Sequence, residues 1–159
     1  MKQRITELKW GFIFTISLLV WMVLERMVGL HDQHIDKHVI YTNFWAIPAI
    51  AIYVLALLEK RKKDLDGTMS YSEGFISGLV ITFVVTILVP LNQYIISYVI
   101  TPDYFNNVIA YSVQNDIMTR EEAEAQFNFL NYMKQGLIGA PIMGIITSGI
   151  VAIFTRSKS

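Results

Sequence analysis

The sequence predicts an all-α, polytopic membrane protein, and two observations carry this prediction. The 159-residue chain is 53% hydrophobic and 16% charged, whereas typical soluble domains are about 25% charged. The charges are also unevenly spread and leave long stretches without one acidic or basic side chain. A membrane-spanning helix needs about 20 apolar residues, a length that strands do not reach. We expect one integral membrane domain over 1–159, with spans at about 8–28, 39–58, 74–98 and 135–155.

The first expected span starts after a basic segment and carries Glu25 and Arg26 near its end. A cleaved signal peptide also combines a basic start with an apolar run. Here, however, the charged pair and bulky side chains stand where a small-residue cleavage site belongs. We therefore expect an uncleaved helix whose charged pair lies near one membrane interface.

The other three spans fall within stretches that are uncharged throughout, namely 39–58, 74–102 and 135–155. Core helices of soluble proteins carry a polar face, and these stretches lack one. With four spans, both termini and the 59–73 loop share one side of the membrane. That side holds nine of the 13 basic residues: Lys2, Arg4, Lys9, Lys60, Arg61, Lys62, Lys63, Arg156 and Lys158. By the positive-inside rule, both termini should be cytoplasmic, in a bacterial inner membrane.

The connections contain turn and cap signals. Asp64-Leu65-Asp66-Gly67 predicts a turn in which glycine adopts a positive φ. The second outer loop should form a small helical hairpin over about 102–134, with Thr101 as the N-cap and Pro102 as the first helical residue. Thr119 and Glu122 have capping-box spacing. We expect the helix that they start to run without a break through Tyr132 into the last span.

Small side chains recur every four residues along the last two spans, at Gly74, Gly78, Thr82 and Thr86 and at Gly136, Ala140, Gly144, Ser148 and Ala152. Membrane helices associate closely through such surfaces. One interpretation is a homodimer interface. The other, which we favour, is contact between helices of one chain.

The three histidines of the chain, His31, His34 and His38, fall within eight residues, with Asp32 and Asp36 between them. On a helix these spacings place the rings on one face. Imidazole binds zinc, nickel or copper, and a carboxylate could complete the site. A pH-responsive cluster and ordinary loop polarity are the alternatives. An outer polar cluster is expected nearby, formed by Glu25, Asn43, Asn92 and Gln93.

Motifs for catalysis are missing from the sequence. There is no cysteine, no glycine-rich phosphate loop and no metalloprotease motif. We therefore expect a non-enzymatic protein without a cofactor, acting through helix–helix assembly with itself or a membrane partner and not with nucleic acid. The alternative is a metal- or pH-responsive protein or small permeation pathway that uses the histidines. An enzyme acting on lipid at the outer surface, with a histidine as general base, is a third hypothesis.

Five segments resemble a bacterial family of small integral membrane proteins, catalogued as domain of unknown function 4199. They are Lys9-Trp10-Gly11, the 29–38 segment Gly-Leu-His-Asp-Gln-His-Ile-Asp-Lys-His, Tyr41-Thr42-Asn43 with Ala46-Ile47-Pro48, Gly74-Phe75-Ile76-Ser77-Gly78, and Met118-Thr119 before Glu121-Glu122-Ala123-Glu124. The resemblance extends over nearly the whole chain. It implies a four-helix inner-membrane protein. It implies no activity and no catalytic residues.

Overall fold

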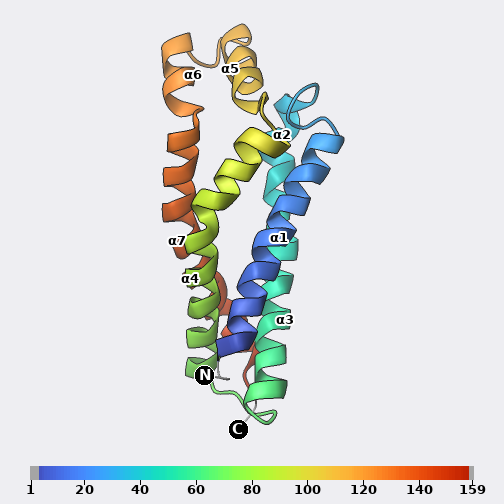
Figure 1. The fold of residues 1–159 in the computed structure, drawn as a ribbon, viewed down its shortest axis with the longest axis vertical. Coiled ribbons are helices and arrows are strands. Elements are labelled where there is room, and N and C mark those ends of the chain that lie inside the picture. The colour runs from blue at the N-terminus through green and yellow to red at the C-terminus, as the bar shows by residue number, and fades with distance from the viewer. Residues whose placement is uncertain (1–3, 158–159) are drawn as a thin grey trace. The chain divides into compact units, whose positions relative to one another are not determined.

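The computed structural model describes residues 4–157, which are all-helical and contain no strand. Lys2 and Lys158, two of the basic residues counted above, lie outside this range. The helices are α1 (Ile5–Met27), α2 (Ile35–Tyr41), the 3₁₀ turn η2 (Thr42–Trp45), α3 (Ala46–Asp64), α4 (Tyr71–Ile95), the π-helix η3 (Ile96–Ile100), α5 (Tyr104–Gln114), α6 (Arg120–Gln126) and α7 (Phe129–Thr155) (Figure 1).

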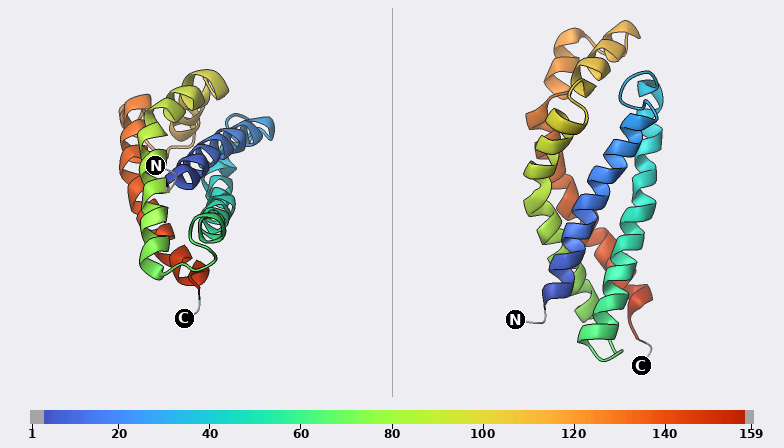
Figure 2. Two further views of the ribbon diagram at one scale, coloured as in Figure 1. Left: turned by 60° about the horizontal axis from the view of Figure 1, so that its bottom comes forward. Right: turned by 45° about the vertical axis from the view of Figure 1, so that its right-hand side comes forward.

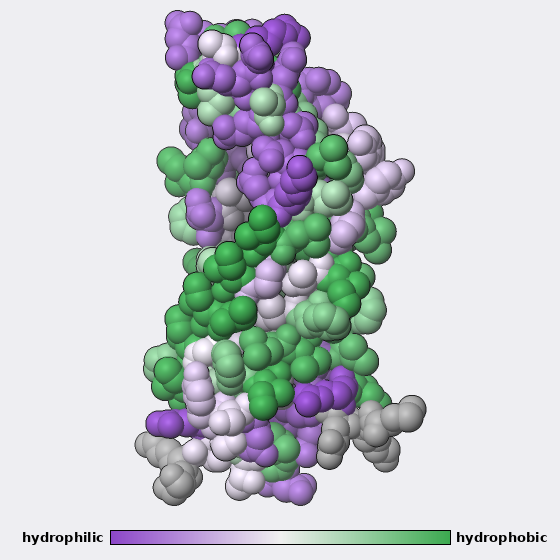
Figure 3. All heavy atoms as spheres, turned by 90° about the vertical axis from the view of Figure 1, so that its left-hand side faces the viewer, coloured by the Kyte–Doolittle hydropathy of each residue, from purple (hydrophilic) through white to green (hydrophobic). Residues whose placement is uncertain are grey.

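Four helical stretches are long and apolar enough to cross a membrane, which confirms the predicted fold class. They are Ile5–Met27, Ile35–Asp64, Tyr71–Ile100 and Phe129–Thr155. Large apolar side chains on these stretches stay exposed, as Phe83 (65%) and Phe154 (80%) illustrate. Figure 3 shows broad apolar areas on the visible face and hydrophilic side chains gathered in separate areas. Such apolar surface is what a helix that faces lipid requires.

The chain forms two compact units. The first unit consists of the described parts of 1–16, 46–88 and 138–159, and the second of 17–45 and 89–137. Each unit therefore takes its helices from segments that are distant in sequence.

In the first unit, α4 and α7 contact each other through their small side chains. The pairs are Gly74 with Ala152, Gly78 with Ser148, and Thr82 with Gly144. A Cβ atom at Gly78 would lie 2.6 Å from the Cβ of Ser148, so glycine is required for this approach. The hydroxyl of Ser148 donates back to the carbonyl of Gly144 (2.6 Å), so it is satisfied within its own helix. The ladders at these positions thus make contacts within one chain.

Apolar side chains from α3, α4 and α7 form the core beside these ladders, including Leu57, Ile81 and Val151. Tyr53 lies among them, with its ring edge-on to Phe14 of α1 and its hydroxyl 2.8 Å from the Thr82 hydroxyl. A buried phenol normally finds such a partner. Tyr53 therefore joins segments of three helices.

A buried ion network lies at one end of the first unit. Glu7 of α1 is 1% exposed and Lys60 of α3 is 6% exposed. The Lys60 ammonium lies 3.1 Å from Glu7 and 3.0 Å from Asp64, and Ser77 of α4 donates to Glu7 at 3.2 Å. Burying a charge is costly unless it is paired and hydrogen-bonded. The network satisfies this requirement and holds α1, α3 and α4 together.

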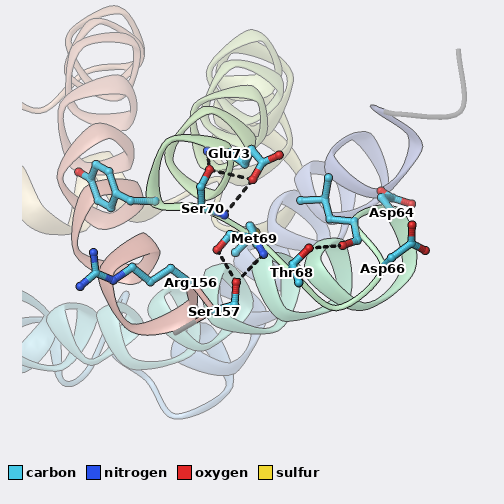
Figure 4. A pocket seen from close by; sticks show the side chains of 10 residues that line it. Asp64, Asp66, Thr68, Met69, Ser70, Glu73, Arg156 and Ser157 are labelled. Atoms are coloured by element: carbon cyan, nitrogen blue, oxygen red, sulfur yellow. Dashed lines mark hydrogen bonds between the residues drawn. The ribbon is translucent and has the colours of Figure 1, made fainter. Parts of the chain in front are cut away.

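The same end of the first unit holds the start of α1, the turn between α3 and α4, and the end of α7 (Figure 2). In the turn, Gly67 has φ +85°, as the Asp64–Gly67 segment predicts. The backbone N–H of Met69 donates to the Ser157 hydroxyl (2.8 Å), and the N–H of Ser157 donates to the Met69 carbonyl (2.9 Å) (Figure 4). These bonds attach the segment after α7 to the turn.

The second unit departs from the predicted hairpin at two places. The helix from Arg120 does not continue into the last span but ends at Gln126, and α7 begins at Phe129. Asn128 is the physical reason. Its side-chain amide donates to the carbonyls of Glu124 and Ala125 at the end of α6, while its oxygen accepts from the N–H of Asn131 in α7. One asparagine thus caps both helix ends.

The first hairpin helix starts at Tyr104, not at Pro102. Thr101 was predicted as its N-cap, but its N–H and hydroxyl both donate to the Ile96 carbonyl and so close the preceding π-helix. By contrast, the capping box of Thr119 and Glu122 is present as predicted. The N–H and hydroxyl of Thr119 donate to the Glu122 carboxylate and lower its pKa.

Replacing Gly144 with alanine should destabilise the α4–α7 contact, because the new Cβ would lie 2.8 Å from the Cβ of Thr82. Overpacking of this kind costs about 1–3 kcal/mol. Gly139 lies on the same helix, and a Cβ there would meet no atom within 4 Å. In thermal unfolding of the detergent-purified protein, Gly144→Ala should lower Tm and Gly139→Ala should not. Equal Tm values for the two variants would contradict this packing.

Replacing Lys60 with methionine should destabilise the first unit, because the buried Glu7 carboxylate loses its ammonium partner and keeps only the more exposed Arg4 guanidinium, 3.2 Å away. The expected loss is about 3–5 kcal/mol in the free energy of unfolding, measured by SDS denaturation in mixed micelles. Lys62, which is exposed on the same helix, provides the control variant Lys62→Met. The double variant Glu7→Gln/Lys60→Met should recover part of the loss, and no recovery would show that the ion pair is not the cause.

Candidate metal centre

Glu25 lies near the end of α1 and is the central residue of the second unit. It is 3% exposed although it carries a carboxylate. The indole N–H of Trp21, one turn earlier on α1, donates to its Oε1 atom at 2.5 Å. This bond fixes the side chain and leaves Oε2 for other partners.

A tight turn after α1 returns the chain to Glu25. The N–H of Leu30 donates to the Glu25 carbonyl and the N–H of Gly29 to the Arg26 carbonyl, both at 3.0 Å. These two bonds define a Schellman motif, which needs a residue with positive φ at the glycine position. Gly29 meets this need with φ +78°. The turn brings His31 back against the carboxylate, with Nε2 3.1 Å from Oε2 of Glu25.

The second histidine comes from the short helix that follows. His38 of α2 places its Nε2 atom 3.3 Å from the same Oε2 atom. The rings of His31 and His38 lie edge to face, with centroids 5.1 Å apart. One ligand atom from each of Glu25, His31 and His38 lies within 4.8 Å of the other two. Both rings are largely buried, with side-chain exposures of 7% and 15%.

This arrangement has the dimensions of a metal site. Zinc bonds histidine nitrogen and carboxylate oxygen at about 2.0–2.2 Å, so neighbouring ligand atoms of a tetrahedral site lie about 3.3 Å apart. The oxygen of Glu25 is 3.1 Å and 3.3 Å from the two imidazole nitrogens. Two imidazoles and one carboxylate form a ligand set that catalytic zinc sites also use, with a fourth position left open.

Side chains of α5 and α7 cover the two histidines. Tyr104 of α5 places its hydroxyl 3.3 Å from Nδ1 of His38 and 3.2 Å from the hydroxyl of Tyr132 in α7. Burial is the main cause that raises the pKa of Tyr104, and the neighbouring Tyr132 adds to it. One turn further along α5, the amide of Asn107 donates to the backbone carbonyl of His31 at 2.9 Å. The α5 helix therefore contacts both candidate ligands.

A cavity of about 210 Å³ adjoins the two rings. Its lining includes His31, His38, Gln93, Ser97, Thr101 and Tyr104. The π-helix η3 supplies part of this wall, and such wide turns are frequent at functional sites. The guanidinium of Arg26 donates to the carbonyl of Ile100 and ties η3 to the end of α1. Space for an additional ligand thus lies next to the histidines.

The structure brings together only some of the residues that the sequence pointed to. Glu25, from the expected outer polar cluster, lies with His31 and His38. His34 precedes α2 and is exposed, as are Asp32 and Asp36. The three rings do not share a face, because the chain turns at Gly29 and becomes helical again only at Ile35.

The remaining members of the expected outer polar cluster take different positions. Asn43 is exposed and donates to the carbonyl of Val39 at 2.6 Å. Asn92 is buried, and its Oδ1 atom has no hydrogen-bond partner within 4–157. Gln93 donates to the Ser97 hydroxyl and lines the cavity beside the histidines. Of these three, Gln93 is thus the residue that borders the site.

Sequence reasoning missed four residues of the site: Trp21, Tyr104, Asn107 and Tyr132. Trp21 carried a local signal, because a side chain four residues before Glu25 on a helix lies beside it. The others come from α5 and α7, more than 65 positions after His31 and His38. Their spacing held no signal that relates them to the histidines.

A larger hollow of about 950 Å³ lies in the first unit (Figure 4). Its lining includes Asp64, Ser70, Glu73 and Arg156. The Glu73 carboxylate accepts from the N–H and hydroxyl of Ser70, so it acts as a helix cap. The second unit therefore contains the better candidate site.

Fold and site together define the class: an all-helical protein with four candidate membrane spans and a buried carboxylate–histidine cluster. Residues 9–157 match the family model described as "Protein of unknown function (DUF4199)", and the chain belongs to this family. No curated protein and no solved structure matches the chain. The resemblance seen in the sequence motifs is thereby confirmed.

Proposed function

We propose that this chain is a multi-pass protein of the bacterial inner membrane that binds one divalent metal ion at Glu25, His31 and His38. Zinc fits the ligand set and spacing best. The proposal is supported chiefly by the 3.1 Å and 3.3 Å distances from the Glu25 oxygen to the two imidazole nitrogens. In this proposal both termini are cytoplasmic and the metal site lies towards the outer surface.

The electrostatics of the site favour a cation. The described second unit buries one carboxylate against two imidazoles, whose ring nitrogens can serve as ligands of a divalent ion. A divalent ion would replace the hydrogen bonds of the carboxylate with direct coordination. The short connection 28–34 gives the ligands a fixed geometry through its Schellman turn, and α5 shields them from solvent.

Assembly with itself or with a membrane partner stays a prediction. The small-residue ladders suggested it, but Gly78 and Gly144 are used in contacts between α4 and α7 of the same chain. A role as an enzyme is not part of the proposal. Metal binding is the function for which the geometry gives a specific reason.

The metal proposal predicts one high-affinity zinc site per chain. Detergent-purified protein with a histidine-free affinity tag should be titrated in competition with a chromophoric chelator. His31→Ala and His38→Ala should each weaken binding at least about 100-fold, since each removes a ligand. His34→Ala, the matched control from the same segment, should bind as the wild type does because His34 is exposed.

Two results would overturn the proposed site. Weak binding by the wild type, unchanged in the His31→Ala/His38→Ala variant, would remove metal binding altogether. An equal loss of zinc affinity in His34→Ala would mean instead that all three histidines bind the metal, as a cluster on a mobile loop. Circular dichroism should first show that each variant keeps its helix content.

The orientation can be tested with introduced cysteines, because the chain has none. Glu121→Cys lies on α6 and Lys62→Cys near the end of α3, and both positions are exposed. On intact spheroplasts, a membrane-impermeant maleimide should label position 121 and not position 62. After the membrane is permeabilised, both should react. Labelling of position 62 in intact cells would reverse the proposed topology.

A further inference from the structure

The contacts of α5 assign a role to residues that are not ligands themselves. Tyr104 lies on the far side of the His38 ring from Glu25, with its hydroxyl at Nδ1. Tyr132 lies behind it, hydroxyl to hydroxyl. Nε2 of His38 faces the carboxylate and Nδ1 faces this tyrosine pair, so the ring is held at both nitrogens.

Without metal, the hydrogen-bond directions follow from the inventory of donors and acceptors. An ionised carboxylate only accepts, so Nε2 of a neutral His38 must carry the hydrogen that points at Glu25. Nδ1 then has a lone pair and accepts from the Tyr104 hydroxyl. Tyr104 in turn can accept from Tyr132. The hydroxyl of a phenol can both donate and accept.

A metal at Nε2 reverses these directions. Coordination needs the Nε2 lone pair, so the neutral ring must carry its hydrogen on Nδ1 instead. One proton leaves Nε2 and one arrives at Nδ1 by exchange with water, and the charge of His38 does not change. The Nδ1–H then donates to the oxygen of Tyr104, whose own O–H turns to donate to Tyr132. A phenol pair permits this reversal without moving a heavy atom.

We propose that Tyr104, supported by Tyr132, is the positioning residue that stabilises the metal-binding tautomer of His38. This inference rests on the proposed function, because it concerns the same metal site. His31 provides the contrast: its buried Nδ1 atom has no hydrogen-bond partner within the described residues. Outer hydrogen bonds to a ligating histidine fix its tautomer and orientation and raise its basicity.

The test compares single-hydroxyl deletions by zinc titration. Tyr104→Phe keeps the ring packing but removes the acceptor, and should weaken zinc binding about 10–100-fold, the usual cost of losing such a partner. Tyr111→Phe removes a hydroxyl from the same helix, two turns away, and should bind like the wild type. Tyr132→Phe should show a smaller loss, since Tyr104 can still accept from Nδ1–H.

A spectroscopic readout separates positioning from a general structural effect. In zinc-loaded protein with ¹⁵N-labelled histidine, the His38 resonances, assigned by their absence in His38→Ala, should show a protonated Nδ1 and a metal-bound Nε2. In Tyr104→Phe saturated with zinc, the Nδ1–H signal should shift upfield and exchange faster with water. A structural role would leave that signal unchanged.

The outcomes distinguish the inference from the function on which it rests. A wild type that does not bind zinc overturns both. Tight binding by the wild type and by Tyr104→Phe alike overturns the inference alone. If Tyr104→Phe fails to fold, Tyr132→Phe provides the test. A loss of zinc affinity in this variant supports the positioning role of the tyrosine pair. Wild-type zinc affinity with an unchanged Nδ1–H signal overturns it.

Discussion

The carboxylate of Glu25 sets the main constraint on the second unit, because a buried charge is tolerated only when its oxygens are satisfied. Trp21 satisfies one oxygen from within α1. The other oxygen faces His31 and His38, and neither could reach it if the helix simply continued. The Schellman turn at Gly29 and the short helix α2 are therefore needed to bring their rings to the charge. The need to give the Glu25 carboxylate its hydrogen-bond partners thus determines the local path of the chain.

The first unit meets the same constraint with different chemistry. Glu7 is as buried as Glu25, but its partners are the guanidinium of Arg4, the ammonium of Lys60 and the hydroxyl of Ser77. An ammonium has no lone pair at neutral pH and cannot coordinate a metal, so this network is suited to holding helices together. Histidine can be a donor or a ligand. The identity of the partner thus separates a structural ion pair from a candidate metal site.

Sequence patterns predicted the features that depend on neighbouring residues. Apolar stretches with few or no charges predicted the four candidate spans, and the Thr119 capping box and the turn at Gly67 followed from local chemistry. The break between α6 and α7 was missed, because Asn128 caps both helices only when the chain is already bent there. The site was predicted in part. The histidines stood out, but a helical spacing was assumed over 31–38, whereas α2 begins only at Ile35.

The residues of α5 that cover the site show why the remaining part of the site could not be predicted from the sequence. Tyr104 and Asn107 are three residues apart, so they share one face of α5, and that face meets His38 and the His31 carbonyl. Each is an ordinary residue for a short helix between two candidate spans. Their arrangement acquires meaning only once the histidines are placed, because the ring nitrogen away from Glu25 needs a partner that can accept as well as donate. A phenol meets that need and a side chain with donors alone does not.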